Sequence, residues 1–136
     1  MWRGLALDWP TPRQSSDRAP LLARTAITAL ELVRDADEAR RALLRNAEQL
    51  RSGLGLLGFE VPAGNSQILP VLIGENHRTM RLSAELLARG VFVQGIRPPT
   101  VREGTARLRL TPMATHRPEH IQRALDAFAS IRKGMA

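Results

Sequence analysis

The fold of this chain is decided by residues 105–111, which read Thr-Ala-Arg-Leu-Arg-Leu-Thr. Apolar and charged residues alternate strictly in this stretch, and a period of two is the pattern of a β-strand that buries one face. Ala106, Leu108 and Leu110 are therefore expected to face a core. Arg107 and Arg109 are expected to lie about 6.5–7 Å apart on the opposite face, given the rise per residue of a strand.

Short apolar runs on the N-terminal side of this stretch predict further strands. Residues 66–73 are almost wholly apolar and predict an interior strand, although Pro70 cannot donate to a ladder and is more typical of an edge or a bulge. Residues 59–61 and 91–94 are predicted to form two more strands. The turn signal Pro-Ala-Gly-Asn at 62–65 separates the first two of these runs.

Helical spacing of apolar residues predicts three helices. The first begins at Pro20 and keeps its apolar residues three or four apart through Leu50, which predicts one long amphipathic helix over 19–54. The second is expected to begin with Asn76 as its N-terminal cap and to end before Gly90. The third is expected to start at Pro118.

The order of these elements is helix, strand, strand, helix, strand, strand, helix, which predicts an α+β fold. We expect a small mixed or antiparallel sheet with helices on one face and the two arginines on the other. The predicted divisions are a tail over 1–18, which has no helical or strand periodicity and is expected to be disordered, a linking helix over 19–54 and a small domain over 55–136.

The net charge of +7 raises the possibility of a nucleic-acid-binding module. The basic residues are spread evenly, however, and aromatic residues make up only 4% of the chain, too few for base-stacking platforms. We expect no nucleic-acid partner and no membrane partner, because no apolar run is long enough to span a bilayer. Cytoplasmic localisation is the expectation, and a module that docks through its first helix is a further alternative.

Metal and nucleophile chemistry find little support in the sequence. There is no cysteine, and the three histidines, His77, His116 and His120, lack the surrounding carboxylates of a metal motif. A glycine-rich phosphate loop and a nucleophile elbow are also missing. We therefore predict no metal site and assign no catalytic residue.

The segment between the last two strands contains the most informative candidate site. The two prolines at 98–99 are expected to hold the loop extended and to project Thr100 on a stiff arm. Arg107 or Arg109 could clamp a carboxylate, because the planar guanidinium offers two parallel donors. The alternatives remain a rigid loop without a ligand and a solvated arginine pair worth less than about 1 kcal/mol.

Residues 19–132 resemble the C-terminal region of α-oxoamine synthases, which are class II members of the pyridoxal-phosphate-dependent aminotransferase family. The resemblance is carried by residues 25–30 (Thr-Ala-Ile-Thr-Ala-Leu), 66–71 (Ser-Gln-Ile-Leu-Pro-Val), 86–94 (Leu-Leu-Ala-Arg-Gly-Val-Phe-Val-Gln), 96–101 (Ile-Arg-Pro-Pro-Thr-Val) and 104–111 (Gly-Thr-Ala-Arg-Leu-Arg-Leu-Thr). The last two stretches are the most specific. They are most similar to the branch of the family that acts in biotin synthesis, with a branch like glycine C-acetyltransferase as the alternative.

This resemblance implies the C-terminal small domain of a homodimeric fold-type I enzyme that condenses an amino acid with an acyl thioester and releases CO₂. For the biotin branch the implied substrates are L-alanine and a pimeloyl thioester of CoA or an acyl-carrier protein. By the same likeness Arg109 would bind the amino-acid carboxylate and Thr100 would contact substrate. Arg97 would support the loop or meet the acyl chain.

The resemblance also implies where the cofactor would be held. In the family, the lysine that carries pyridoxal phosphate, an aspartate and the phosphate-binding residues belong to a large domain that would precede residue 19. Residues 1–18 do not resemble that domain, and Lys133 is not placed to replace its lysine. We therefore expect no stable cofactor binding by this chain, no activity of the chain alone, and either a homodimer or a separate N-terminal large domain as its partner.

Overall fold

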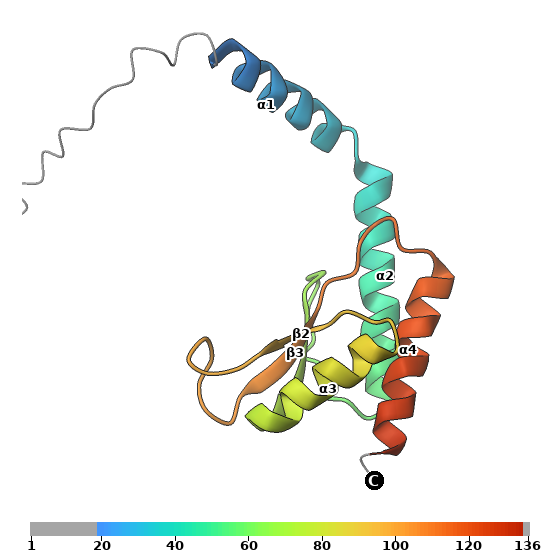
Figure 1. Ribbon diagram of the computed structural model, residues 1–136. Helices are drawn as coiled ribbons and strands as arrows, with labels where there is room; N and C mark the ends of the chain where they lie inside the picture. Colours follow the sequence, from blue (N-terminus) through green and yellow to red (C-terminus); the bar gives the residue numbers. More distant parts are fainter. Residues whose placement is uncertain (1–18, 135–136) are drawn as a thin grey trace, which may run out of the picture. The chain divides into compact units, whose positions relative to one another are not determined.

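The computed structural model describes residues 19–134, which form four helices and three strands (Figure 1). In chain order they are α1 (Ala19–Arg34), α2 (Asp37–Leu56), β1 (Leu69–Gly74), α3 (Asn76–Ala88), β2 (Gln94–Ile96), β3 (Ala106–Leu110) and α4 (Pro118–Lys133). The chain divides into two units after Ala36. Within the described residues, the first unit consists of α1 and the two residues that follow it, Asp35 and Ala36. The second unit contains all the other elements.

The sheet has three antiparallel strands in the order β1-β3-β2, so β3 is the central strand. Its alternation is as predicted from residues 105–111. Ala106, Leu108 and Leu110 are buried, Arg107 is half-buried and Arg109 is exposed. The strand, its two faces and the α+β fold class are confirmed.

The buried face of the sheet packs against helices from the same unit. α3 contacts all three strands, and α4 contacts both α2 and α3 (Figure 1). At the centre of the core the rings of Phe59 and Phe128 meet edge to face with centroids 5.3 Å apart. Among residues 37–134, no helix covers the face that carries Arg107 and Arg109.

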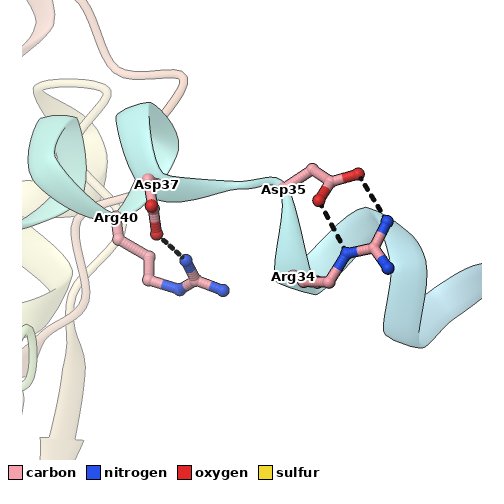
Figure 2. Close-up of polar contacts among 4 residues, drawn as sticks. All are labelled: Arg34, Asp35, Asp37 and Arg40. Carbon is pink, nitrogen blue, oxygen red and sulfur yellow. Dashed lines mark hydrogen bonds and ion pairs between the residues drawn. The ribbon is translucent and has the colours of Figure 1, made fainter.

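The prediction of one continuous helix over 19–54 is wrong, because the helix is interrupted at Asp35-Ala36. At the interruption the Ala36 amide bonds back to the Val33 carbonyl at 3.3 Å, a tightened final turn. The new helix opens with Asp37 and Glu38, and carboxylates favour a helix N-terminus. Figure 2 shows an ion pair on each side of the break, Arg34 with Asp35 and Arg40 with Asp37.

The second helix, α2, belongs to the same unit as the sheet. Leu50 and Leu54 are buried in the core beside Phe59. The predicted division between 54 and 55 therefore differs from the observed one, which follows Ala36. The physical reason is that the second half of the predicted helix buries Leu50 and Leu54 in the core and packs against α4.

The strand predictions need three corrections. Residues 59–61 form only an isolated bridge from Glu60 to Leu72, and the strand predicted at 91–94 lies instead at 94–96. The strand predicted at 66–73 is found at 69–74, but it is an edge strand of the described sheet rather than an interior one. An edge position accommodates Pro70, which lacks the backbone donor that an interior strand requires.

The ends of α3 and α4 follow from local chemistry. The carboxylate of Glu75, not the predicted Asn76, caps α3 by accepting the amides of His77 and Arg78, both at 2.7 Å. Gly90 adopts a positive φ of 78° just after the helix, as predicted for its C-terminal stop. The predicted start of the last helix at Pro118 is also confirmed.

Candidate functional site

Arg109 lies on the helix-free face of the sheet, in its central strand. Its cross-strand partners are Pro70 on β1 and Gln94 on β2. Directly paired residues of antiparallel strands point to the same face, so these two side chains flank Arg109. Arg109 therefore lies on the exposed face of the sheet, as the alternation of its strand predicts.

The guanidinium of Arg109 donates a hydrogen bond from Nη2 to Oε1 of Gln94. Within residues 19–134, Arg109 makes no ion pair with a carboxylate and no other side-chain hydrogen bond. A guanidinium carries five N–H donors in a planar fork. Most of the donors of Arg109 are thus available to a ligand on this face.

Arg107 shares the face with Arg109 but is used differently. Its Nε donates to the Thr105 carbonyl oxygen at 3.0 Å, and the residue is half-buried. Its cross-strand partners, Leu72 and Ile96, are apolar. The sequence pattern treats the two arginines alike, whereas the structure ties Arg107 to its own loop and leaves Arg109 more open.

The prediction of an extended proline loop is wrong. The Thr100 amide donates to the Arg97 carbonyl oxygen at 3.1 Å, so residues 97–100 form a closed turn that contains a cis Pro98-Pro99 bond. The side chains of Arg97 and Thr100 are exposed. The structure thus joins Arg97 to Thr100 through the backbone. In the described part of the chain, no hydrogen bond or ion pair connects either residue with Arg109.

A second concave feature was not anticipated from the sequence. A pocket of about 670 Å³ lies on the helix side of the unit, with a floor made by Leu50, Val93, Leu110 and Ile121. Its polar lining residues include His116 and Arg123, and no carboxylate lines it. The wall of this pocket comes from four separate parts of the chain: α2, the segment before β2, the end of β3, and α4. No local sequence pattern could therefore have revealed the pocket.

The two histidines that are four apart do form a pair. The rings of His116 and His120 lie 5.8 Å apart, centroid to centroid, and their Nδ1 atoms accept the amides of Met113 and Arg117, each at 3.2 Å. These bonds fix the turn that leads into α4. No group of three or more potential ligands suitable for a metal ion occurs in residues 19–134.

None of the helices found between residues 19 and 134 is both long and apolar enough to cross a bilayer.

Comparison with known proteins identifies the family. The family model for aminotransferase class I and II matches residues 9–128. The match includes part of the segment over 1–18 that we predicted to differ from the family. Over 119 residues the chain is 44% identical to the 8-amino-7-oxononanoate synthase of Trichlorobacter lovleyi, covering 86% of this chain and 30% of that protein.

Solved structures agree with this relationship. A serine palmitoyltransferase from S. paucimobilis with a bound PLP-myriocin aldimine superimposes with a TM-score of 0.76 and 31% identity, over 81% of this chain and 28% of that one. The 8-amino-7-oxononanoate synthase of Francisella tularensis shares the fold, with a TM-score of 0.73 and 20% identity, over 85% of this chain and 34% of that one. The chain spans about 30% of the length of the curated relatives that it matches. On the family match and the identity to these relatives, this chain belongs to the aminotransferase class I and II family.

Proposed function

We propose that this chain is the carboxylate-binding part of a pyridoxal-phosphate-dependent 8-amino-7-oxononanoate synthase. The full enzyme would condense L-alanine with a pimeloyl thioester, with loss of CO₂, in biotin synthesis in the cytoplasm. The proposal is supported by the 44% identity to synthases of that name. The single structural observation that carries it is the open, uncompensated guanidinium of Arg109 on the helix-free face of the sheet.

Arg109 has the chemistry that an amino-acid carboxylate requires. Two N–H groups on one edge of its fork can donate in parallel to the two carboxylate oxygens, and such charge-assisted pairs are about twice as strong as neutral hydrogen bonds. Among the described residues no carboxylate competes for that edge. Holding the carboxylate at two points would also fix the rotation of the substrate about the bond from its carboxylate to Cα.

Thr100 and Arg97 are assigned to the same substrate region. They are exposed on the loop that joins β2 to β3, and this loop leaves the sheet next to the Ile96–Arg107 pair. Arg107 thus lies between Arg109 and the loop along the strand. In this assignment the loop contacts the substrate beyond its carboxylate, with Arg97 toward the acyl chain.

The cofactor does not fit the residues described here. Pyridoxal phosphate acts as an electron sink when it is held on a lysine. The only lysine in the sequence is Lys133, which is exposed in the last turn of α4 and belongs to none of the strands that carry the arginine face. We therefore assign the cofactor to other residues of the complete enzyme, in a large domain or a second subunit, and propose that this chain is inactive alone.

A graft tests the proposal. Residues 19–132 would replace the matching stretch of the Trichlorobacter lovleyi synthase, and thiol release from pimeloyl-CoA would be measured with L-alanine. Arg109→Ala should lower kcat/KM for L-alanine about 100-fold, because two charge-assisted hydrogen bonds are lost. Arg102→Ala, an exposed arginine of the same hairpin, is the matched control and should stay within about twofold. Equal effects of the two substitutions would overturn the assignment of Arg109.

The same assay tests the chain by itself. Purified chain mixed with pyridoxal phosphate, L-alanine and pimeloyl-CoA should release no thiol and leave the visible spectrum of the cofactor unchanged. Measurable turnover in this mixture would contradict the assignment of the cofactor to other residues.

A further inference from the structure

We propose that Gln94 is a positioning residue that sets the orientation of the Arg109 guanidinium for carboxylate binding. This inference rests on the proposed function and adds a second residue to that site. Gln94 does not stand out in the sequence, since it follows an apolar run and belongs to no charged pattern. Its role emerges only from the pairing of β2 with β3.

The pairing places Gln94 directly opposite Arg109 on the same face of the sheet. The Gln94 Oε1 atom accepts a hydrogen bond from Nη2 of Arg109. On the other side of Arg109 lies Pro70, whose ring offers neither a donor nor an acceptor. Within residues 19–134, Gln94 is thus the polar side chain that restrains the guanidinium.

The chemistry of the pair also fixes the Gln94 amide. Arginine can only donate, so the glutamine oxygen must face Arg109 and its NH₂ group must point away. In the part of the chain that the structure describes, this NH₂ group has no hydrogen-bond partner. It is available as a further donor to an anionic ligand that binds beside the guanidinium.

A neutral partner suits this role better than a charged one. A carboxylate at position 94 would form an ion pair with Arg109, occupy its donors and neutralise the charge that attracts a substrate carboxylate. The Gln94 amide restrains the guanidinium with one hydrogen bond and leaves its full positive charge. The surface is therefore suited to a single carboxylate held by Arg109 and Gln94 together.

The experiment uses the 136-residue chain and NMR of the arginine side chains, with Arg109→Lys to assign the Arg109 signals. L-alanine is the probe, and L-alaninamide, which lacks the carboxylate, is the control ligand. Gln94→Met keeps the length of the side chain and removes the acceptor, whereas Gln94→Glu adds the competing charge. Gln122→Met is the matched control, because Gln122 is an exposed glutamine whose amide bonds to Asp126 at 2.9 Å on α4.

We expect L-alanine, but not L-alaninamide, to shift the Arg109 signals of the unmodified chain. Gln94→Met should weaken L-alanine binding about threefold to tenfold, the range expected for one hydrogen bond, and speed the rotation of the Arg109 guanidinium. Gln94→Glu should abolish the response, and Gln122→Met should leave it unchanged. Melting temperatures of the four proteins should agree, because an exposed pair contributes little to folding.

Two outcomes separate the inference from the function on which it rests. If Gln94→Met binds L-alanine as the unmodified chain does and its Arg109 guanidinium rotates equally slowly, the positioning role of Gln94 is overturned while Arg109 keeps its assignment. If L-alanine shifts no Arg109 signal in the unmodified chain, the proposed function fails. In that case, faster guanidinium rotation in Gln94→Met still supports the restraint by Gln94, and equal rotation overturns it.

Discussion

The side-chain amide of Asn46 donates a 2.9 Å hydrogen bond to the carbonyl oxygen of His116, 70 residues further along the chain. The same Nδ2 atom donates to the Met113 carbonyl oxygen at 3.0 Å. Asn46 is buried on α2, so this helix holds the turn between β3 and α4 through one polar side chain. Without it the His116 carbonyl would lose this donor, whereas the Met113 carbonyl would keep the His116 amide at 3.1 Å.

Replacing Asn46 with alanine should therefore destabilise the unit that contains the sheet. The expected loss is about 1–3 kcal/mol, the net contribution of two hydrogen bonds. Urea unfolding followed by circular dichroism would measure it. Gln49→Ala on the same helix is the control, because Gln49 is exposed, and it should change the free energy of unfolding by less than about 0.5 kcal/mol. Similar values for the two variants would show that the Asn46 bonds contribute nothing.

Phe128 provides a test of the core. The residue is fully buried on α4 and meets Phe59 edge to face at 5.3 Å. Phe128→Ala should cost about 3–5 kcal/mol through lost burial and the cavity left behind. Phe92→Ala makes the same chemical change at a side chain that is 81% exposed, and it should cost well under about 1 kcal/mol. Thermal or urea unfolding of both variants gives the comparison.

The sequence allowed the fold class to be predicted because the decisive patterns are local. The alternation in 105–111 and the Pro118 start each occupy a few consecutive residues, and both are confirmed. The sequence did not reveal the break at Asp35-Ala36, because apolar spacing continues across it into α2, whose residues Leu50 and Leu54 belong to the core.

The candidate site was predictable in part for a similar reason. Arg109 could be assigned to a face from the period of its own strand. The pairing of Gln94 with Arg109 could not be predicted in this way, because cross-strand register depends on the length and shape of the loop between the strands. The closed turn at 97–100 shortens that loop. An extended loop had been expected there, so the register that pairs Gln94 with Arg109 could not be predicted.

The end of α1 gives a prediction about pH. The Arg34 guanidinium donates to the Asp35 carboxylate, at 2.8 Å from Nε, and this hydrogen bond lowers the pKa of Asp35 (Figure 2). A lowered pKa means that the pair stabilises the local structure at pH values above the ordinary aspartate range. The stabilisation is lost as the pH falls through the lowered pKa.

NMR titration of the Asp35 carboxyl should thus show a lower pKa in the unmodified chain than in Arg34→Ala. Arg24→Ala is the control, because Arg24 is an exposed arginine of the same helix, and it should leave the Asp35 titration unchanged. An Asp35 pKa that does not rise in Arg34→Ala would show that the ion pair is not populated in solution.

Gly95 on β2 lies against α3. A Cβ atom at this position would lie 2.9 Å from Sδ of Met80 and 3.5 Å from Cγ2 of the buried Thr79. Gly95→Ala should cost less than about 1 kcal/mol, because the end of the Met80 side chain is flexible and can move. Gly95→Val adds two methyl groups against α3 and should cost about 1–3 kcal/mol, in spite of the preference of valine for strands.

Gly55→Ala is the control for this series, and its expected effect on stability has the opposite sign. Gly55 lies within α2, and nothing would contact an added Cβ within 4 Å. The substitution should stabilise the chain by about 0.5–1 kcal/mol, because alanine loses less backbone freedom than glycine in a helix. Urea unfolding should therefore rank the proteins as Gly55→Ala, unmodified chain, Gly95→Ala and Gly95→Val in falling stability. A Gly95→Val protein as stable as the unmodified chain would mean that α3 does not approach β2 as closely as this packing requires.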